Sequence, residues 1–137
     1  MGKDRSYTTA LHILAALAFY PGGLLSSEDL AKSLKTNPGL VRRILLKLSK
    51  KGLITSFKGK GGGSRLARTA TDITLDEVYL AVKEGPLFRS FDKEPFKACK
   101  VSCNIGGILN GVYSDLEVGL IEEMKKVKLQ KILSEIN

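Results

Sequence analysis

The segment from Asn37 to Ala67, NPGLVRRILLKLSKKGLITSFKGKGGGSRLA, decides the fold of this chain. Asn37 is a good N-cap, and Pro38 stands where the first helical residue belongs, because its missing N–H would have no partner there. Four apolar residues follow at the spacing i, i+3, i+4 and i+7: Val41, Ile44, Leu45 and Leu48. This spacing predicts an amphipathic helix with one buried stripe. Gly52 predicts the left-handed cap that ends it.

The second half of the segment predicts a β-hairpin. Two short apolar runs, 53–57 and 65–67, flank a glycine-rich, basic stretch at 58–63. Glycine allows the sharp turns of a hairpin tip. We therefore expect two strands joined by a basic tip.

Two helices are expected before this segment. Ser6 can cap a first helix, which the Pro-Gly-Gly at 21–23 ends. Ser26, followed three residues later by Asp29, is a capping box that predicts a second helix from Glu28 to Leu34. Three helices and a hairpin in this order are a winged helix-turn-helix, in which the third helix enters the major groove of DNA.

The remainder of the chain predicts a fourth helix, a linker and a long helix. Thr74 and Glu77 form a second capping box, which begins a helix through Val82. From about Ser102 a helical pattern runs to the end, with a break near Val127. Its apolar stripe is wider than a lone surface helix needs, so we expect it to meet a second subunit. The expected fold is mainly α with a small β-hairpin wing: a winged helix-turn-helix domain at 1–84, a linker at 85–101 and a dimerisation helix region at 102–137.

The charge of the chain is distributed unevenly. Its net charge is +8, but residues 1–68 hold 13 basic and 3 acidic residues, whereas residues 69–137 hold 9 and 11. Between Asp29 and Asp72 all 11 charged residues are basic. Such a stretch repels itself unless a polyanion compensates it, so double-stranded DNA is the expected partner. The alternative is a protein-interaction module that binds an enzyme or another regulator through the winged helix or the C-terminal helix.

Other classes of protein find little support in the sequence. No apolar run reaches the ~18 residues that a membrane span needs, and no signal-peptide pattern opens the chain, so we expect a cytoplasmic protein without membrane contact. No nucleophile–base pair and no metal-ligand spacing is visible, and His12 is the only histidine. We therefore expect neither an enzyme nor a metal site.

The hairpin and the capping box after it also carry a resemblance to a known family. The stretch 53–67, followed by Ile-Thr-Leu-Asp-Glu-Val at 73–78, resembles the bacterial regulators IscR, NsrR and CymR, often called the Rrf-two family. The resemblance extends over nearly the whole chain. It implies a homodimeric winged-helix regulator, usually a repressor, whose long C-terminal helices pack across the dimer. Two positions depart from the family, which usually has arginine where Lys58 stands and an aromatic residue where Ser64 stands. Lysine lacks the planar fork of arginine, so we expect the specificity of the wing to differ.

The expected DNA contacts come from the third helix and the wing. Arg42 and Arg43 lie on the helix face opposite the apolar stripe, where arginine can contact phosphate or pair with guanine. The resemblance places the start of the recognition helix at 37–43 and the wing tip at 61–63. The candidate residues are Asn37, Gly39, Arg42, Arg43, Lys47, Lys58, Lys60, Gly61, Gly62, Gly63 and Arg65.

Two cysteines precede the long helix. Iron–sulfur members of the family carry three cysteines here, but this chain has only Cys99 and Cys103. The resemblance therefore favours the cluster-free members, and we expect no iron–sulfur cluster and no other cofactor. Lys97 and Lys100 flank Cys99 at the expected helix start, a setting that favours a reactive thiolate. Two hypotheses stay open: a redox or electrophile sensor, or two partly buried structural thiols. A small-molecule effector is the other candidate signal.

Overall fold

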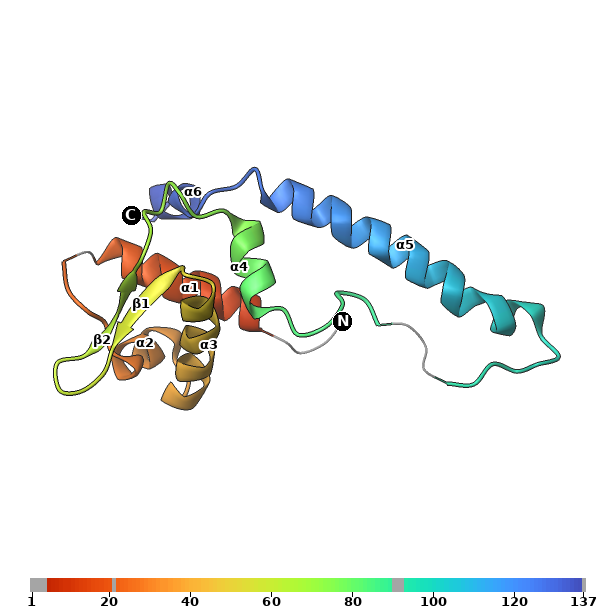
Figure 1. Ribbon diagram of the computed structural model, residues 1–137, viewed down its shortest axis with the longest axis horizontal. Helices are drawn as coiled ribbons and strands as arrows, with labels where there is room; N and C mark the ends of the chain where they lie inside the picture. Colours follow the sequence, from red (N-terminus) through yellow and green to blue (C-terminus); the bar gives the residue numbers. More distant parts are fainter. Residues whose placement is uncertain (1–4, 21, 90–92, 137) are drawn as a thin grey trace.

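Six helices and two strands make up the described part of the chain, residues 5–20, 22–89 and 93–136, in a computed structural model (Figure 1). Their order is α1 (Ser6–Phe19), α2 (Ser27–Leu34), α3 (Pro38–Lys50), β1 (Ile54–Phe57), β2 (Gly63–Leu66), α4 (Leu75–Val82), α5 (Lys100–Met124) and α6 (Leu129–Ser134). The predicted fold class, mainly α with a hairpin wing and a long C-terminal helix, is confirmed.

Helices α2 and α3 start at the N-caps that the sequence predicts, and local hydrogen bonds stabilise these starts. The Asp29 N–H donates to Ser26 Oγ at 3.0 Å, and the Ser26 N–H donates to Asp29 Oδ2 at 3.1 Å. These bonds lower the pKa of the Asp29 carboxyl. Asn37 Oδ1 accepts the Leu40 N–H at 2.9 Å, so the predicted caps of α2 and α3 are confirmed.

The predicted cap of the first helix is wrong. Ser6 is the first residue of α1, and Arg5 precedes it without a side-chain cap. The physical reason is that the Thr9 N–H donates to the Arg5 carbonyl oxygen at 2.8 Å, which places Ser6 inside the first turn.

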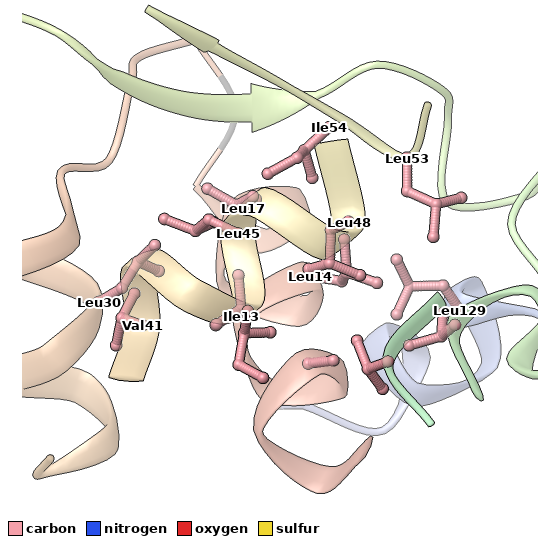
Figure 2. Close-up of a cluster of buried hydrophobic side chains, with 14 of the residues drawn as sticks. Ile13, Leu14, Leu17, Leu30, Val41, Leu45, Leu48, Leu53, Ile54 and Leu129 are labelled. Carbon is pink, nitrogen blue, oxygen red and sulfur yellow. The ribbon is translucent and has the colours of Figure 1, made fainter. Parts of the chain in front are cut away.

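The core lies where the apolar faces of α1, α3, α4 and α6 meet beneath the hairpin (Figure 2). The four residues of the predicted α3 stripe are all buried: Val41, Ile44, Leu45 and Leu48. Gly52 has a φ of +72°, and the Leu53 N–H donates to the Leu48 carbonyl at 3.1 Å, as expected for a left-handed helix end. Leu53 thereby turns back into the core, which fixes the start of the hairpin on α3.

The hairpin is antiparallel, with Ile54 opposite Leu66 and Phe57 opposite Gly63. The prediction that Gly63 belongs to the tip is therefore wrong, because Gly63 is the first residue of β2. A Cβ on Gly63 would lie 2.7 Å from the Leu25 carbonyl oxygen, so the close approach of the segment before α2 requires glycine there. That segment bridges to β2 through two hydrogen bonds between Leu25 and Ser64, at 3.1 and 2.8 Å. A Cβ on Gly62 would lie 2.2 Å from the Phe57 oxygen, so the turn itself also depends on glycine.

The end of the chain returns to the winged helix. The helical pattern breaks at 125–128, as expected near Val127, and α6 packs on α1. Leu129 is fully buried, and its N–H donates to the Ile73 carbonyl at 2.9 Å. The sequence grouped α6 with the dimerisation helix, but its side chains complete the core of the winged helix.

The long helix α5 extends away from the rest of the chain (Figure 1), and none of its residues is buried. Several large apolar side chains on it are exposed: Val101, Ile108, Val112, Leu116, Val118 and Leu120. No helix within the described ranges is long and apolar enough to cross a membrane.

Candidate nucleic-acid interface

The N-terminal half of α3 presents a basic face to solvent. Arg42 and Arg43 are both exposed on the side opposite the core stripe, with Gly39 and Leu46 beside them. In Figure 1 this half of α3, helix α2 and the tip of the hairpin lie on one side of the winged helix, and α6 lies on the other. The two elements that the sequence assigned to DNA binding are therefore placed on a common face.

The start of α3 is suited to an anion. Asn37 uses its side-chain oxygen for the cap, and Gly39 stands exposed in the first turn, where a Cβ would meet that oxygen at 3.1 Å. N–H groups of a first helical turn carry partial positive charge and favour phosphate. Both residues thus lie where a backbone phosphate would approach.

The two neighbouring arginines of α3 have different surroundings. Arg42 Nη1 lies 3.6 Å from Glu28 Oε1 of α2, and both side chains are well exposed, at 60% and 64%. The Arg43 side chain makes no hydrogen bond or ion pair with the residues that the structure describes. In the N-terminal half of α3, Arg43 is therefore a cation with no competing partner among the described residues.

Lys47, one helical turn after Arg43, is paired within the fold. Its ammonium pairs with Glu84 just beyond α4, and only 27% of its side chain is exposed. Lys47 thus joins α3 to α4, although the sequence placed it among the DNA contacts.

The wing has cations at its tip and on its strand β2. Lys58 and Lys60 are exposed at the tip, where the Gly62 N–H donates to the Gly59 oxygen at 2.9 Å and closes the turn. Arg65 lies lower on β2, with its guanidinium carbon 5.0 Å from the centroid of the Phe57 ring. This stacking holds the guanidinium against an exposed ring. The glycines at 59, 61 and 62 leave the tip backbone uncovered for a close approach.

Arg68 belongs to the fold, although the sequence counted it in the basic stretch. Its Nε lies 3.0 Å from Asp72 Oδ2, and its Nη1 lies 2.5 Å from Glu77 Oε2. The Arg68 hydrogen bonds hold the pKa of the Glu77 carboxyl below its ordinary value. A weak signal for this pairing is present in the sequence, because Asp72 and Glu77 follow Arg68 by four and nine residues.

The two cysteines stand at the start of α5 with different exposure. Cys99 is the half-buried N-cap, and its Sγ accepts the Ser102 N–H at 3.4 Å. Cys103 is exposed, and its Sγ donates to the carbonyl oxygens of Phe96 and Lys97, both at 3.7 Å.

An iron–sulfur cluster is usually held by four thiolates, and this chain supplies two thiols here. One of them serves as a helix cap and the other as a hydrogen-bond donor to carbonyls. Among the residues with a described position, no group of three or more His, Cys, Asp or Glu gathers to hold a metal ion.

His12, the single histidine of the sequence, lies at the surface. Its Nε2 is 2.9 Å from Ser33 Oγ, and this contact joins α1 to α2.

Comparison with known proteins identifies relatives over nearly the whole chain. The Rrf2 family profile, described as "Iron-dependent Transcriptional regulator", matches residues 4–135. YwnA of Bacillus subtilis, whose name is that of an HTH-type transcriptional regulator, is 30% identical over 127 residues, which are 93% of each chain. The HTH-type transcriptional regulator NsrR of Shouchella clausii is 31% identical over 110 residues, 77% of this chain and 73% of NsrR.

The structure of T. potens IscR has the same fold. It superposes with a TM-score of 0.70 at 20% identity and covers 98% of this chain and 88% of IscR. The sequence similarities therefore decide the family, and the likeness in backbone shows the fold.

Proposed function

The chain belongs to the Rrf2 family of transcriptional regulators, and from this premise we propose that it is a sequence-specific, homodimeric, DNA-binding repressor. The observation that carries the proposal is the common face formed by the N-terminal half of α3 and the wing tip. The family consists of regulators, not enzymes. DNA binding implies that the protein works in the cytoplasm.

The proposed complex uses the two elements differently. The first turns of α3 enter the major groove, where Arg43 reads a guanine edge and Arg42 contacts phosphate. Lys58 and Lys60 bring the wing tip to the phosphates or the adjacent minor groove. Asn37 and the α3 N-terminus approach a backbone phosphate.

The proposed dimer forms through α5. A helix of 25 residues with no buried side chain leaves apolar side chains in water along one face, where Val101 is 67%, Ile108 60% and Val112 46% exposed. Contiguous apolar surface of this kind marks an interaction site. A second copy covers it symmetrically and places two copies of α3 on half-sites about one helical turn apart.

The proposed regulator works without an iron–sulfur cluster or other cofactor. The support is the donor set at the start of α5, with two thiols already engaged in helix capping and carbonyl contacts. Cys103 is the exposed thiol, and we propose it as the group through which an oxidant or electrophile acts.

Selection of bound duplexes from genomic DNA, followed by titration, tests this function. If the dimer neutralises about 6–10 phosphates, its affinity for the selected duplex falls by roughly three to five decades between 50 and 200 mM salt. Random-sequence duplex is the matched probe and binds much more weakly. A flat salt response, or equal affinity for both duplexes, refutes the proposal, and sedimentation gives the mass of the species that binds.

A further inference from the structure

The orientation of α5 relative to the winged helix depends on few contacts. Helix α5 has no buried residue, and α4 is the helix with which it makes its main packing contact. Just after the C-terminal end of α5, a hydrogen bond joins the chain to the start of α4: the Leu75 N–H donates to the Val127 carbonyl oxygen at 2.9 Å. Further along α5, Tyr113 stacks on Phe88 with ring centroids 5.0 Å apart.

Glu117 is the polar centre of the contact between α4 and α5. Its Oε1 accepts the Tyr79 hydroxyl at 2.7 Å and the Lys83 ammonium at 3.0 Å. Only 17% of the Glu117 side chain is exposed. The Tyr79 and Lys83 bonds hold the pKa of Glu117 below its ordinary value, so the carboxylate stays charged at neutral pH. Charge-assisted hydrogen bonds of this kind are short and directional, so they fix an angle better than apolar contact does.

The same end of α4 is also joined to α3. Glu84, the residue after Lys83, pairs with Lys47. Lys47 lies one helical turn after Arg43 on α3, so the ion pair reaches the helix that carries the basic face. One short segment, 79–84, thus connects α5 to α3.

We propose that Tyr79, Lys83 and Glu117 form a polar latch that sets the angle between α5 and α3 and thereby selects the half-site spacing that the dimer accepts. The ion pair between Lys47 and Glu84 connects the latch to α3. All five are positioning residues, which act on DNA through α3. This inference rests on the proposed function as a dimeric DNA-binding protein.

The length of α5 makes its angle matter. A helix of 25 residues is about 37 Å long. A tilt of about 5° moves its far end by roughly 3 Å, which is close to the 3.4 Å rise of one base pair. Loosening the latch should therefore let the dimer accept neighbouring spacers.

Titration of duplexes with altered spacers tests the latch. The probes carry two inverted copies of the half-site that the wild type selects, with the spacer kept or changed by one or two base pairs. Glu117→Ala should reduce the preference for the native spacer by about fivefold or more, the lower end of typical coupling between sites. Glu117→Gln keeps an acceptor and should give an intermediate profile.

Glu123→Ala is the matched control, because Glu123 lies on the same helix and pairs with Lys126 at 2.9 Å, with 72% of its side chain exposed. Its spacer profile should equal that of the wild type. If Glu117→Ala weakens binding by the same factor at every spacer length, or gives the spacer profile of Glu123→Ala, the proposed latch is wrong. Where Glu117→Ala does not fold, Tyr79→Phe and Lys83→Gln take its place.

A measurement without DNA separates this inference from the proposed function. Spin labels at Lys50→Cys and Asn110→Cys, with both native cysteines changed to serine and unlabelled protein in excess, report the distance between α3 and α5 within one subunit. Both labelled positions are exposed. The distance distribution should widen in Glu117→Ala, and a width equal to that of the wild type overturns the latch. A wild type that binds no duplex refutes the proposed function, and the label distance still decides whether Glu117 holds α5.

Discussion

Replacing Arg43 by alanine tests whether α3 reads bases, and Arg42→Ala supplies the comparison on the adjacent residue. Both side chains are exposed on the same helix, so neither change should alter the core. Their difference lies in Glu28, whose carboxylate is 3.6 Å from Arg42, whereas Arg43 has no described internal partner. The two variants therefore separate base reading from phosphate contact.

The expected magnitudes follow from these surroundings. A bidentate arginine–guanine pair contributes about 1–3 kcal/mol of discrimination, so Arg43→Ala should weaken binding to the selected duplex roughly 5- to 150-fold. Arg42 must give up an exposed ion pair worth at most about 1 kcal/mol before it contacts phosphate. Arg42→Ala should therefore cost less than about tenfold, equally on all sequences, and lower the salt slope by about 1.

Fluorescence anisotropy with the selected duplex, a duplex with the contacted guanine replaced, and random DNA measures all three quantities. Arg43→Ala should bind the selected and guanine-replaced duplexes with nearly equal affinity. If it instead weakens binding to selected and random DNA by the same factor, Arg43 contacts only phosphate and the assignment of base reading to it is wrong. Unchanged thermal unfolding of both variants is the control for folding.

Four further predictions concern the charge, core, pH response and thiols. Glu28→Gln removes a carboxylate from the proposed DNA-binding face and should tighten DNA binding by up to about fivefold, since an exposed pair is worth up to about 1 kcal/mol. Unchanged affinity in anisotropy titrations would mean that no DNA phosphate lies near α2. Leu129→Ala should lower the free energy of unfolding in urea by about 2–5 kcal/mol, and a loss under about 1 kcal/mol would contradict the burial of α6 in the core. Because Arg68 depresses the pKa of Glu77 in the folded chain, the stability from this pair is present at neutral pH and is lost as pH falls through that lowered pKa. Glu77→Gln should therefore be less stable at pH 7 and lose less stability on acidification, and parallel urea curves at pH 7 and pH 3 would contradict this. Hydrogen peroxide should weaken DNA binding by the wild type but not by Cys103→Ser, whereas an insensitive wild type would show that the thiols are structural.

The sequence predicted those parts of the fold that depend on near neighbours. The caps at Ser26 and Asn37 join groups three residues apart, so their residue types alone indicate the bonds. The α3 stripe follows from one helical period. The exposure of Arg42 and Arg43 could also be predicted, because a helix with one buried stripe turns its other residues toward solvent.

The parts that the sequence missed depend on distant contacts. Leu129 is one apolar residue among many near the C-terminus, and its burial depends on Ile73, more than 50 residues earlier. Glu117 and Tyr79 are 38 residues apart, and a glutamate in a solvated helix gives no sign of a hydroxyl partner. Gly63 directly follows two other glycines, so the sequence does not separate it from the hairpin tip. Its place in β2 depends on the close approach of Leu25.

A run of cations predicts a polyanion partner, but it does not say which cations make the contact. The distinction depends on acids that folding brings near, such as Glu84, which is 37 residues from Lys47. The structure pairs Lys47, one of the predicted DNA contacts, with Glu84, and it pairs Arg68, another cation of the basic stretch, with Glu77. We therefore place the proposed DNA-binding face on the first turns of α3 and on the wing, where Arg43 has no described acidic partner. We propose that Lys47 orients α3 through Glu84 and does not contact DNA, and Lys47→Met tests this. This variant should leave the salt slope unchanged while it broadens the spacer preference, because a side chain that orients α3 without touching phosphate releases no counterions.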